Sequence, residues 1–251
     1  MNPARFESQD LGRARFDDVN LAGARFRECN LTGSKMSGVL LEGADIDGAI
    51  DGLVVNGVEV APLIEAELDR RHPERAELRV TDGPSARRAI VVVQQLWAPT
   101  MARAAVLPEE QQHESVDCEW SFVQTLRHLL FVTDAWFRRS VLDLPEPFSP
   151  ESLPASFIHD GSDLGVDATA DPSFDQVARG RVERFAQIQR YLEDADNATL
   201  LTPGRPPTGP GFPPAKERTP MECLRVVFNE EWEHHRFAVR DLDRLGLNPK
   251  P

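Results

Sequence analysis

Two ionisable residues stand in the middle of an apolar stripe near the end of the chain. An ionised carboxylate among apolar side chains is costly unless a cation or strong hydrogen-bond donors compensate it. Because residues four apart on a helix point the same way, Glu231 and His235 are predicted to share one divalent metal ion. At helical spacing the stripe comprises Leu224, Val227, Phe228, Glu231, His235, Ala238, Leu242 and Leu245.

The sequence also offers a third ligand, in an earlier helical segment. His128 is the histidine of the segment 121–142, and leucines stand on both sides of it. A single buried histidine is, however, more often hydrogen-bonded than metal-bound. Glu231 and His235 could also form a buried ion pair, or Glu231 could meet an arginine such as Arg127. The residues alone leave these alternatives open.

Four helices are predicted to position these groups. Two of them begin with capping-box spacings, Ser121 to Gln124 and Ser173 to Gln176, and a third opens with Thr219-Pro220-Met221-Glu222. The segments 144–170 and 202–218 are rich in proline or glycine and are predicted to be long connections. Four helices with one long crossover favour a four-helix bundle. The predicted helices are 84–106, 121–142, 171–194 and 219–246.

Two of these segments resemble the DinB-like metalloprotein superfamily. They are Glu119–Trp136 (EWSFVQTLRHLLFVTDAW) and Asn229–Leu245 (NEEWEHHRFAVRDLDRL). The resemblance covers roughly residues 80–246. It implies a four-helix bundle with one histidine ligand on the second helix and two ligands one turn apart on the fourth.

The resemblance also implies a ligand set. The family's fourth-helix pattern is His-Glu-x-x-His-Arg, and here it reads Glu231-Trp232-Glu233-His234-His235-Arg236. A glutamate in the first position also occurs in the mycothiol-dependent maleylpyruvate isomerase branch, which uses His, Glu and His. Carried over by position, the implied ligands are His128, Glu231 and His235, and His234 is the rival ligand.

Such a set predicts an open catalytic site. Three protein ligands leave positions for water or substrate, and two neutral imidazoles with one carboxylate leave a divalent cation at net charge +1. Zinc is the default metal, and nickel, manganese or iron(II) are also compatible. The cation would deprotonate a bound thiol, and the resemblance implies a low-molecular-weight thiol such as mycothiol.

The leading functional hypothesis is therefore a metal-dependent thiol S-transferase or detoxification enzyme of unknown substrate. One alternative is a metal-dependent hydrolase, since the same ligands can activate water. The other is a non-catalytic stress-response or interaction module with a structural metal. The candidate substrate-binding residues are Trp120, Arg127, Trp232 and His234, although the tryptophans could equally pack in the core.

The first sixty residues carry a repeat with a period of five. Large apolar residues recur nine times, at Phe6, Leu11, Phe16, Leu21, Phe26, Leu31, Met36, Leu41 and Ile46. A period of five fits neither a helix nor a plain strand. Segments such as Asp10–Ala14 (DLGRA) and Asn20–Ala24 (NLAGA) resemble the pentapeptide-repeat family, which implies a right-handed quadrilateral β-helix of a little over two coils. We expect its large and small side chains to stack inward in columns.

The predicted fold class is therefore α+β with several domains. A short β-helix over 1–60 is followed by a linker with a connecting helix over 61–79, and then by a DinB-like bundle over 80–251. The segment 50–60 is predicted to form a hairpin with its turn at Asn56-Gly57, and Pro62 to begin a short helix.

Composition narrows the class of function. The chain has 251 residues and a net charge of −13, from 28 basic and 41 acidic residues, which disfavours nucleic-acid binding. No apolar run is long enough for a membrane span, and no secretory signal is recognisable. Three distant cysteines fit a reduced, cytoplasmic setting. We therefore expect a small-molecule substrate, and a homodimer is a further hypothesis.

Overall fold

The computed structural model describes residues 4–155, 158 and 164–247. The chain divides into two compact units, Met1–Ile46 and Asp47–Pro251. The division falls ahead of the predicted hairpin, so the hairpin and the connecting helix belong to the second unit. Each unit is described by itself.

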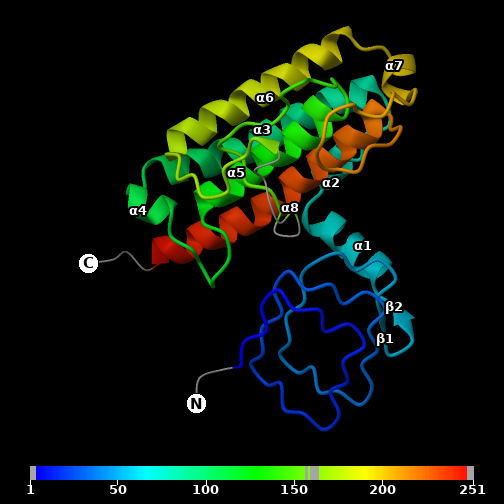
Figure 1. Cartoon of the computed structure of the whole chain (residues 1–251), viewed down its shortest axis with the longest axis vertical. Helices are drawn as coiled ribbons and strands as arrows, with labels where there is room; N and C mark the ends of the chain where they lie inside the picture. Colours follow the sequence, from blue (N-terminus) through cyan, green and yellow to red (C-terminus); the bar gives the residue numbers. More distant parts are fainter. Residues whose placement is uncertain (1–3, 156–157, 159–163, 248–251) are drawn as a thin grey trace. The chain divides into compact units, whose positions relative to one another are not determined.

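The first unit is a regular series of turns (Figure 1). A backbone turn closes every ten residues, where the N–H of Ala14, Ala24, Ser34 or Ala44 donates to the carbonyl three residues before it. At the start of three of these turns the side chains of Asp10, Asn20 and Asn30 accept a hydrogen bond from the N–H two residues on, at 2.8–3.0 Å. Aspartate and asparagine favour such local bonds, which explains their ten-residue spacing.

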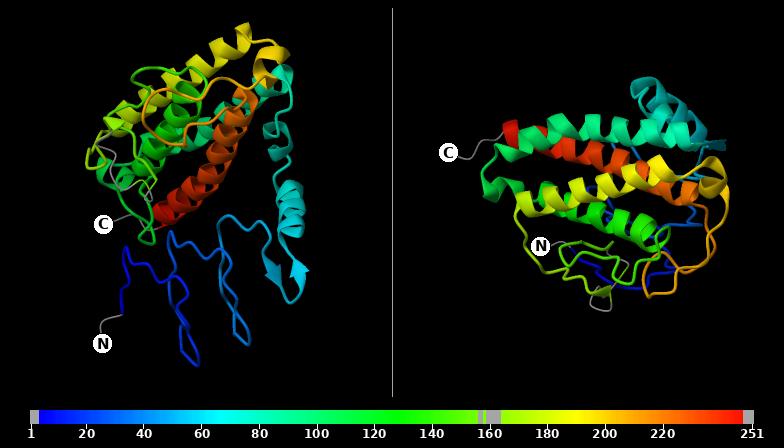
Figure 2. Two further views of the ribbon diagram at one scale, coloured as in Figure 1. Left: turned by 45° about the vertical axis from the view of Figure 1, so that its right-hand side comes forward. Right: turned by 90° about the horizontal axis from the view of Figure 1, so that it is seen from above.

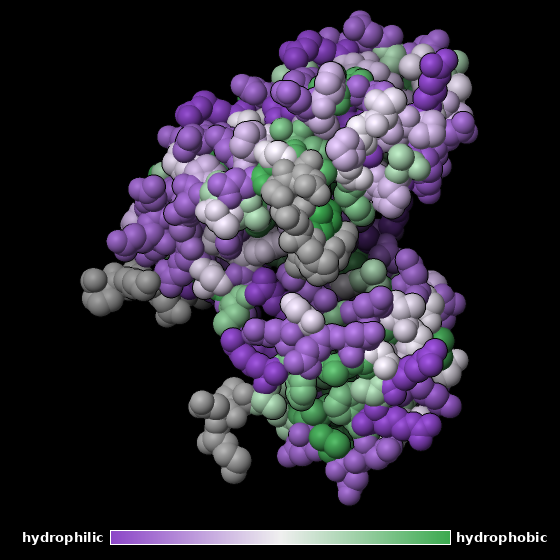
Figure 3. All heavy atoms as spheres, in the orientation of Figure 1, coloured by the Kyte–Doolittle hydropathy of each residue, from purple (hydrophilic) through white to green (hydrophobic). Residues whose placement is uncertain are grey.

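The apolar residues of the repeat do not form a closed core. The nine large side chains remain 44–64% exposed, and Figure 3 shows hydrophobic residues on the visible face of this unit. No β-strand is assigned within residues 4–50, so the structure does not show the predicted β-helix with inward columns. Little more than two coils gives each coil few neighbours to cover its interior, which accounts for the exposure of these side chains.

The second unit begins with the predicted hairpin and connecting helix. Strands β1 (Val54–Val55) and β2 (Val58–Glu59) pair antiparallel. Their two-residue turn has positive φ at Asn56 and Gly57, as a type I′ turn requires. Helix α1 (Ala61–Arg71) has a proline in its first turn, and the short helix α2 (Arg75–Leu78) follows.

Four long helices form the body of the second unit: α3 (Gly83–Ala105), α5 (Phe122–Thr133), α6 (Phe174–Asp194) and α8 (Pro220–Leu247). A π-helical segment, η1 (Asp134–Arg139), extends α5. Two short helices, α4 (Glu109–Gln112) and α7 (Asn197–Leu201), lie in the connections. The predicted capping boxes at Ser121 and Ser173 are confirmed, and Thr219 and Glu222 exchange the same reciprocal bonds.

The long helices lie side by side around one hydrophobic core (Figure 2, right). Helix α8 packs against α3 and α5, and α6 packs against the same two helices. Fully buried side chains from all four helices meet between them, among them Ile90, Leu126, Ile188, Leu224 and Phe228. Because α8 lies between α3 and α5, adjacent residues on α8 face different neighbours. None of the described helices is both long enough and apolar enough to cross a membrane.

Candidate metal centre

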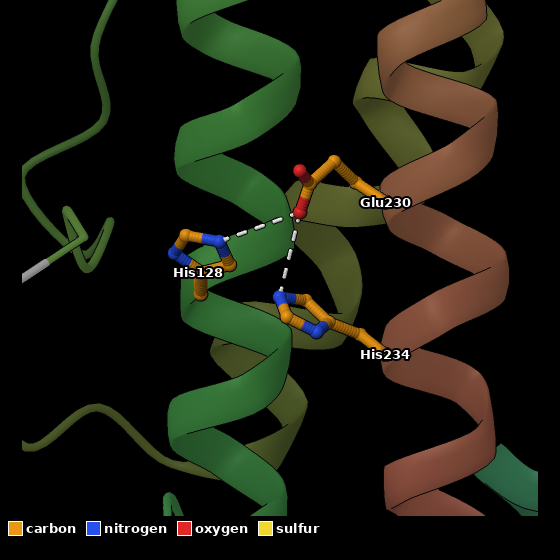
Figure 4. Close-up of side chains that lie close together, drawn as sticks. All are labelled: His128, Glu230 and His234. Atoms are coloured by element: carbon orange, nitrogen blue, oxygen red, sulfur yellow. Dashed lines mark ion pairs between the residues drawn. The ribbon is translucent and has the colours of Figure 1, made fainter. Parts of the chain in front are cut away.

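Three side chains of the types that can ligate a metal converge where α5 meets α8 (Figure 4). His128 comes from α5, and Glu230 and His234 stand one turn apart on α8. One ligand atom of each residue lies within 4.8 Å of the others. Glu230 Oε2 lies 3.8 Å from His128 Nε2 and 3.6 Å from His234 Nε2. It is the one group of three or more such residues found in the described part of the chain.

The spacing and the hydrogen bonding both fit a metal ion. Ligand atoms at about 2.0–2.1 Å from a tetrahedral zinc lie roughly 3.3 Å apart. The three ligand atoms of the cluster lie within 4.8 Å of one another, so they would have to move closer together to bind such an ion. The Nε2 atom of His234 is buried and has no hydrogen-bond partner among the described residues. Such an orphaned atom calls for a ligand. On the far side of the cluster, His128 Nδ1 donates to the Leu153 carbonyl at 3.3 Å, which leaves its Nε2 lone pair directed at the site.

The electrostatics of the cluster favour the metal-binding protonation states. Burial, with His128 nearby, lowers the pKa of His234 to about 4, so this imidazole is neutral at physiological pH. Burial alone would raise the pKa of Glu230, but His128 and His234 outweigh it and hold that pKa below its ordinary value. The neutral form of His234 and the ionised form of Glu230 are the forms that bind a metal.

The site is enclosed on one side and accessible on another. The Trp120 ring lies 4.6 Å from the His128 ring and 6.1 Å from the His234 ring. The side chains of His128 and His234 are 8% and 17% exposed, whereas that of Glu230 is 35% exposed. Glu230 is therefore the member of the cluster that is most exposed to solvent.

Glu231 lies in a different environment. It is 1% exposed and accepts two hydrogen bonds from Arg181 of α6, at 2.8 and 3.1 Å. Arg181 also lies over the Trp97 ring of α3, at 4.9 Å. Burial raises the pKa of Glu231, and the bidentate guanidinium counteracts part of that rise. This is the arginine pairing that the sequence left open, with Arg181 in place of Arg127.

His235 likewise faces away from His128. Its Nε2 atom lies 2.9 Å from the Thr100 hydroxyl of α3, and its ring meets Trp97 edge-on at 5.1 Å. The structure therefore brings His128 together with Glu230 and His234, and it brings neither Glu231 nor His235 to that cluster. The spacing of four residues was predicted, but the pair that contacts His128 begins one residue earlier.

Sequence reasoning missed Glu230 because it followed the centre of the apolar stripe. Glu231 and His235 lie in that centre and face α3 and α6, whereas Glu230 and His234 lie at its edge, facing α5. A signal was present in the chain: Glu230 and His234 repeat the four-residue spacing on the neighbouring face of the helix.

The candidate substrate-binding residues lie in different parts of the helical unit. Trp120 lies beside the cluster, and His234 is one of its three members. Arg127 instead anchors the long connection after η1, since its guanidinium donates to the carbonyls of Glu151 and Asp167 at 2.7 and 2.9 Å. Trp232 is 3% exposed and lines a different hollow of this unit.

Comparison with known families identifies the helical unit. The sequence profile of the DinB superfamily matches residues 93–238, more than half of the chain. The chain belongs to the DinB superfamily. Members of the DinB superfamily often bind a divalent metal, and His128, Glu230 and His234 all fall inside the matched region. Eight copies of the pentapeptide repeat match residues 4–50. No curated protein and no solved structure gives a significant match to the chain.

Proposed function

We propose that this DinB protein holds one divalent metal ion on His128, Glu230 and His234 and uses it as a thiol S-transferase. The observation that carries the proposal is the convergence of three possible ligand atoms, among them the buried Nε2 of His234, which has no hydrogen-bond partner among the described residues. Zinc is the expected metal, because two imidazoles and a carboxylate form a common open zinc set. Nickel, manganese and iron(II) also suit these ligands.

When bound, the cation lowers the pKa of a coordinated thiol and so supplies a nucleophile at neutral pH. The residues of the chain hold and shield this centre. The Leu153 carbonyl fixes the His128 ring through Nδ1, and the Trp120 ring covers one side of the ligands. The exposed edge of Glu230 marks the side from which a thiol such as mycothiol would enter.

The proposal extends to the architecture of the two units. We infer that α3, α5, α6 and α8 form the four-helix bundle that the superfamily implies, since each packs against two of the others around one core. We also infer that residues 4–50 are a short quadrilateral β-helix, because positive φ recurs every five residues along most of the repeat. The repeat would then serve as an interaction module attached to the metal-binding unit.

Turnover with an electrophile tests the activity. The purified chain, loaded with zinc, is mixed with mycothiol and 1-chloro-2,4-dinitrobenzene. In the expected reaction the thiol sulfur bonds to the ring carbon, chloride leaves from that carbon, and the thiol proton is released to solvent. The proposal predicts conjugation above the uncatalysed rate that disappears on chelation and in Glu230→Gln. Glu233→Gln is the matched control, because it changes a glutamate on the same helix outside the ligand cluster.

Two other results would replace the proposed activity. Metal-dependent hydrolysis of p-nitrophenyl acetate without any thiol would make the protein a hydrolase. Thermal stability that rises with metal content, without turnover of either substrate, would make the metal structural and the protein a non-catalytic module.

A further inference from the structure

A second hollow lies beside α8, among residues the metal cluster does not use. Its volume is about 420 Å³, within the size range of small-molecule sites. Leu78 and Val80, at the end of α2, and Trp232 of α8 provide its apolar lining. Trp232 comes two residues after Glu230, so the helix turns it to the far side of α8 from that ligand. The hollow is therefore separate from the proposed metal centre.

Two arginines of this hollow are already neutralised. Arg75 donates to Glu65 and Asp69 at 2.7 Å in both cases. Arg79 donates to Asp69 at 2.6 and 2.8 Å and approaches Glu65 at 3.5 Å. The charges of these two guanidinium groups are thus balanced by the two carboxylates.

Arg225 is the third guanidinium that lines this hollow. Its Nε donates to the Val80 carbonyl at 2.7 Å, which fixes the side chain against the hollow. Within the described part of the chain, its two terminal nitrogens have no hydrogen-bond partner or ion pair. Glu222, three residues before Arg225, interacts with it electrostatically, but the Glu222 carboxylate accepts hydrogen bonds from the Thr219 N–H at 2.7 Å and the Thr219 hydroxyl at 3.2 Å and makes no ion pair with Arg225 within the described residues. Arg225 can therefore offer a bidentate pair of donors to an anion.

Two uncharged polar side chains complete the recognition surface. Thr81 and Asn229 both line the hollow, and neither side chain has a hydrogen-bond partner among the residues described. A hydroxyl and an amide beside one guanidinium suit a carboxylate, and the apolar wall suits a hydrocarbon body.

We propose that this hollow binds a small organic carboxylate with an apolar body, which Arg225 recognises. The chain as a whole is strongly acidic, at −13, and repels anions in general. Binding therefore depends on the local donors and on apolar contact together. A bare inorganic anion lacks the second contribution and is expected to bind much more weakly.

Ligand-observed saturation-transfer NMR tests the proposal with phenylacetate and its neutral counterpart phenylacetamide. The expected result is binding of phenylacetate at least tenfold tighter than that of phenylacetamide. Arg225→Gln should weaken phenylacetate binding at least tenfold and leave phenylacetamide binding unchanged. Arg190→Gln, at an exposed position on α6, is the matched control and should bind like the wild type.

The remaining outcomes overturn the proposal. Equal binding of the two compounds would mean that no carboxylate is recognised. Equal effects of Arg225→Gln and Arg190→Gln would show only general charge attraction, and phosphate competing as well as phenylacetate would show an anion site without apolar selection. Chelation of bound metal should leave phenylacetate binding unaltered, which separates this result from the fate of the metal centre.

Discussion

Glu230 and Glu231 are neighbours in the sequence, but Glu230 faces two histidines and Glu231 faces an arginine. The Glu230 carboxylate lies 3.6 and 3.8 Å from the Nε2 atoms of His234 and His128, with no guanidinium among the causes of its lowered pKa. The Glu231 carboxylate is clamped by both terminal nitrogens of Arg181. One glutamate is thus available to a metal ion, whereas the other is committed to an arginine.

The Arg181–Glu231 pair should be a structural element of the helical unit. Replacing Arg181 by methionine leaves an uncompensated carboxylate in the core, which is expected to lower the free energy of unfolding by about 3–5 kcal/mol. The double variant Arg181→Met, Glu231→Leu removes both charges and should recover most of that loss. Urea denaturation of the single and double variants measures both effects, and equal stability of the two would contradict this role.

The sequence predicted the helix starts and the hairpin turn, which depend on local hydrogen bonds and local backbone conformation. Ser121, Ser173 and Thr219 mark helix starts through hydrogen bonds to residues three positions on, and these local bonds form as expected. The Asn56-Gly57 turn is local in the same way. Such features depend on neighbouring residues only, so the sequence contains what is needed to predict them.

The ligand assignment depended on packing between helices, which the sequence does not show. Glu231 and His235 lie in the apolar stripe at the predicted spacing. However, Glu231 accepts hydrogen bonds from Arg181, and His235 is hydrogen-bonded to Thr100, and both of these partners are far away in the sequence. Helical rotation by one residue moves a side chain by about 100°. That rotation decides which pair meets His128. The short repeat has the same difficulty, because its burial depends on contacts beyond its own coils.

Trp120 should report metal binding by fluorescence. Its ring lies 4.6 Å from the ring of His128, so cobalt(II) or nickel(II) bound at the cluster should quench its emission. Trp120→Phe is expected to remove the largest part of the quenching, whereas Trp136→Phe should leave it. Titration of the metal-free protein measures this difference. Unchanged quenching in Trp120→Phe would place the metal elsewhere.

The three cysteines should differ in reactivity. Cys29 and Cys118 are exposed, whereas Cys223 is buried and its pKa is raised by desolvation to about 11. At pH 8 its thiolate fraction is therefore about 0.1%, roughly two hundredfold below that of an ordinary thiol. Two thiols should react rapidly with Ellman's reagent, and the third only near pH 11 or after unfolding.

Cys223→Ala provides the control for this count. It should abolish the slow reaction and leave both fast thiols, with two in total after denaturation. Rapid reaction of three thiols in the native wild-type protein at pH 8 would show that Cys223 is accessible.

Asp134 should hold the connection between η1 and α6 in place. It is fully buried and accepts hydrogen bonds from Arg184 Nε at 2.7 Å, the Ser149 N–H at 2.8 Å and the Ser152 hydroxyl at 3.2 Å. Asp134→Ala leaves these donors unpaired, and we expect a loss of stability of about 3–5 kcal/mol. Limited proteolysis should cut near 149–152 faster in this variant, and Asp175→Ala, at an exposed position in the first turn of α6, serves as the control.

Metal content in paired histidine variants tests the central claim most directly. Wild type, His234→Gln and His235→Gln are purified, loaded with zinc, desalted and analysed for metal. We expect about one equivalent in the wild type and in His235→Gln, and almost none in His234→Gln, because only His234 turns its free Nε2 toward Glu230 and His128. Retention of zinc by His234→Gln together with its loss from His235→Gln would contradict the site.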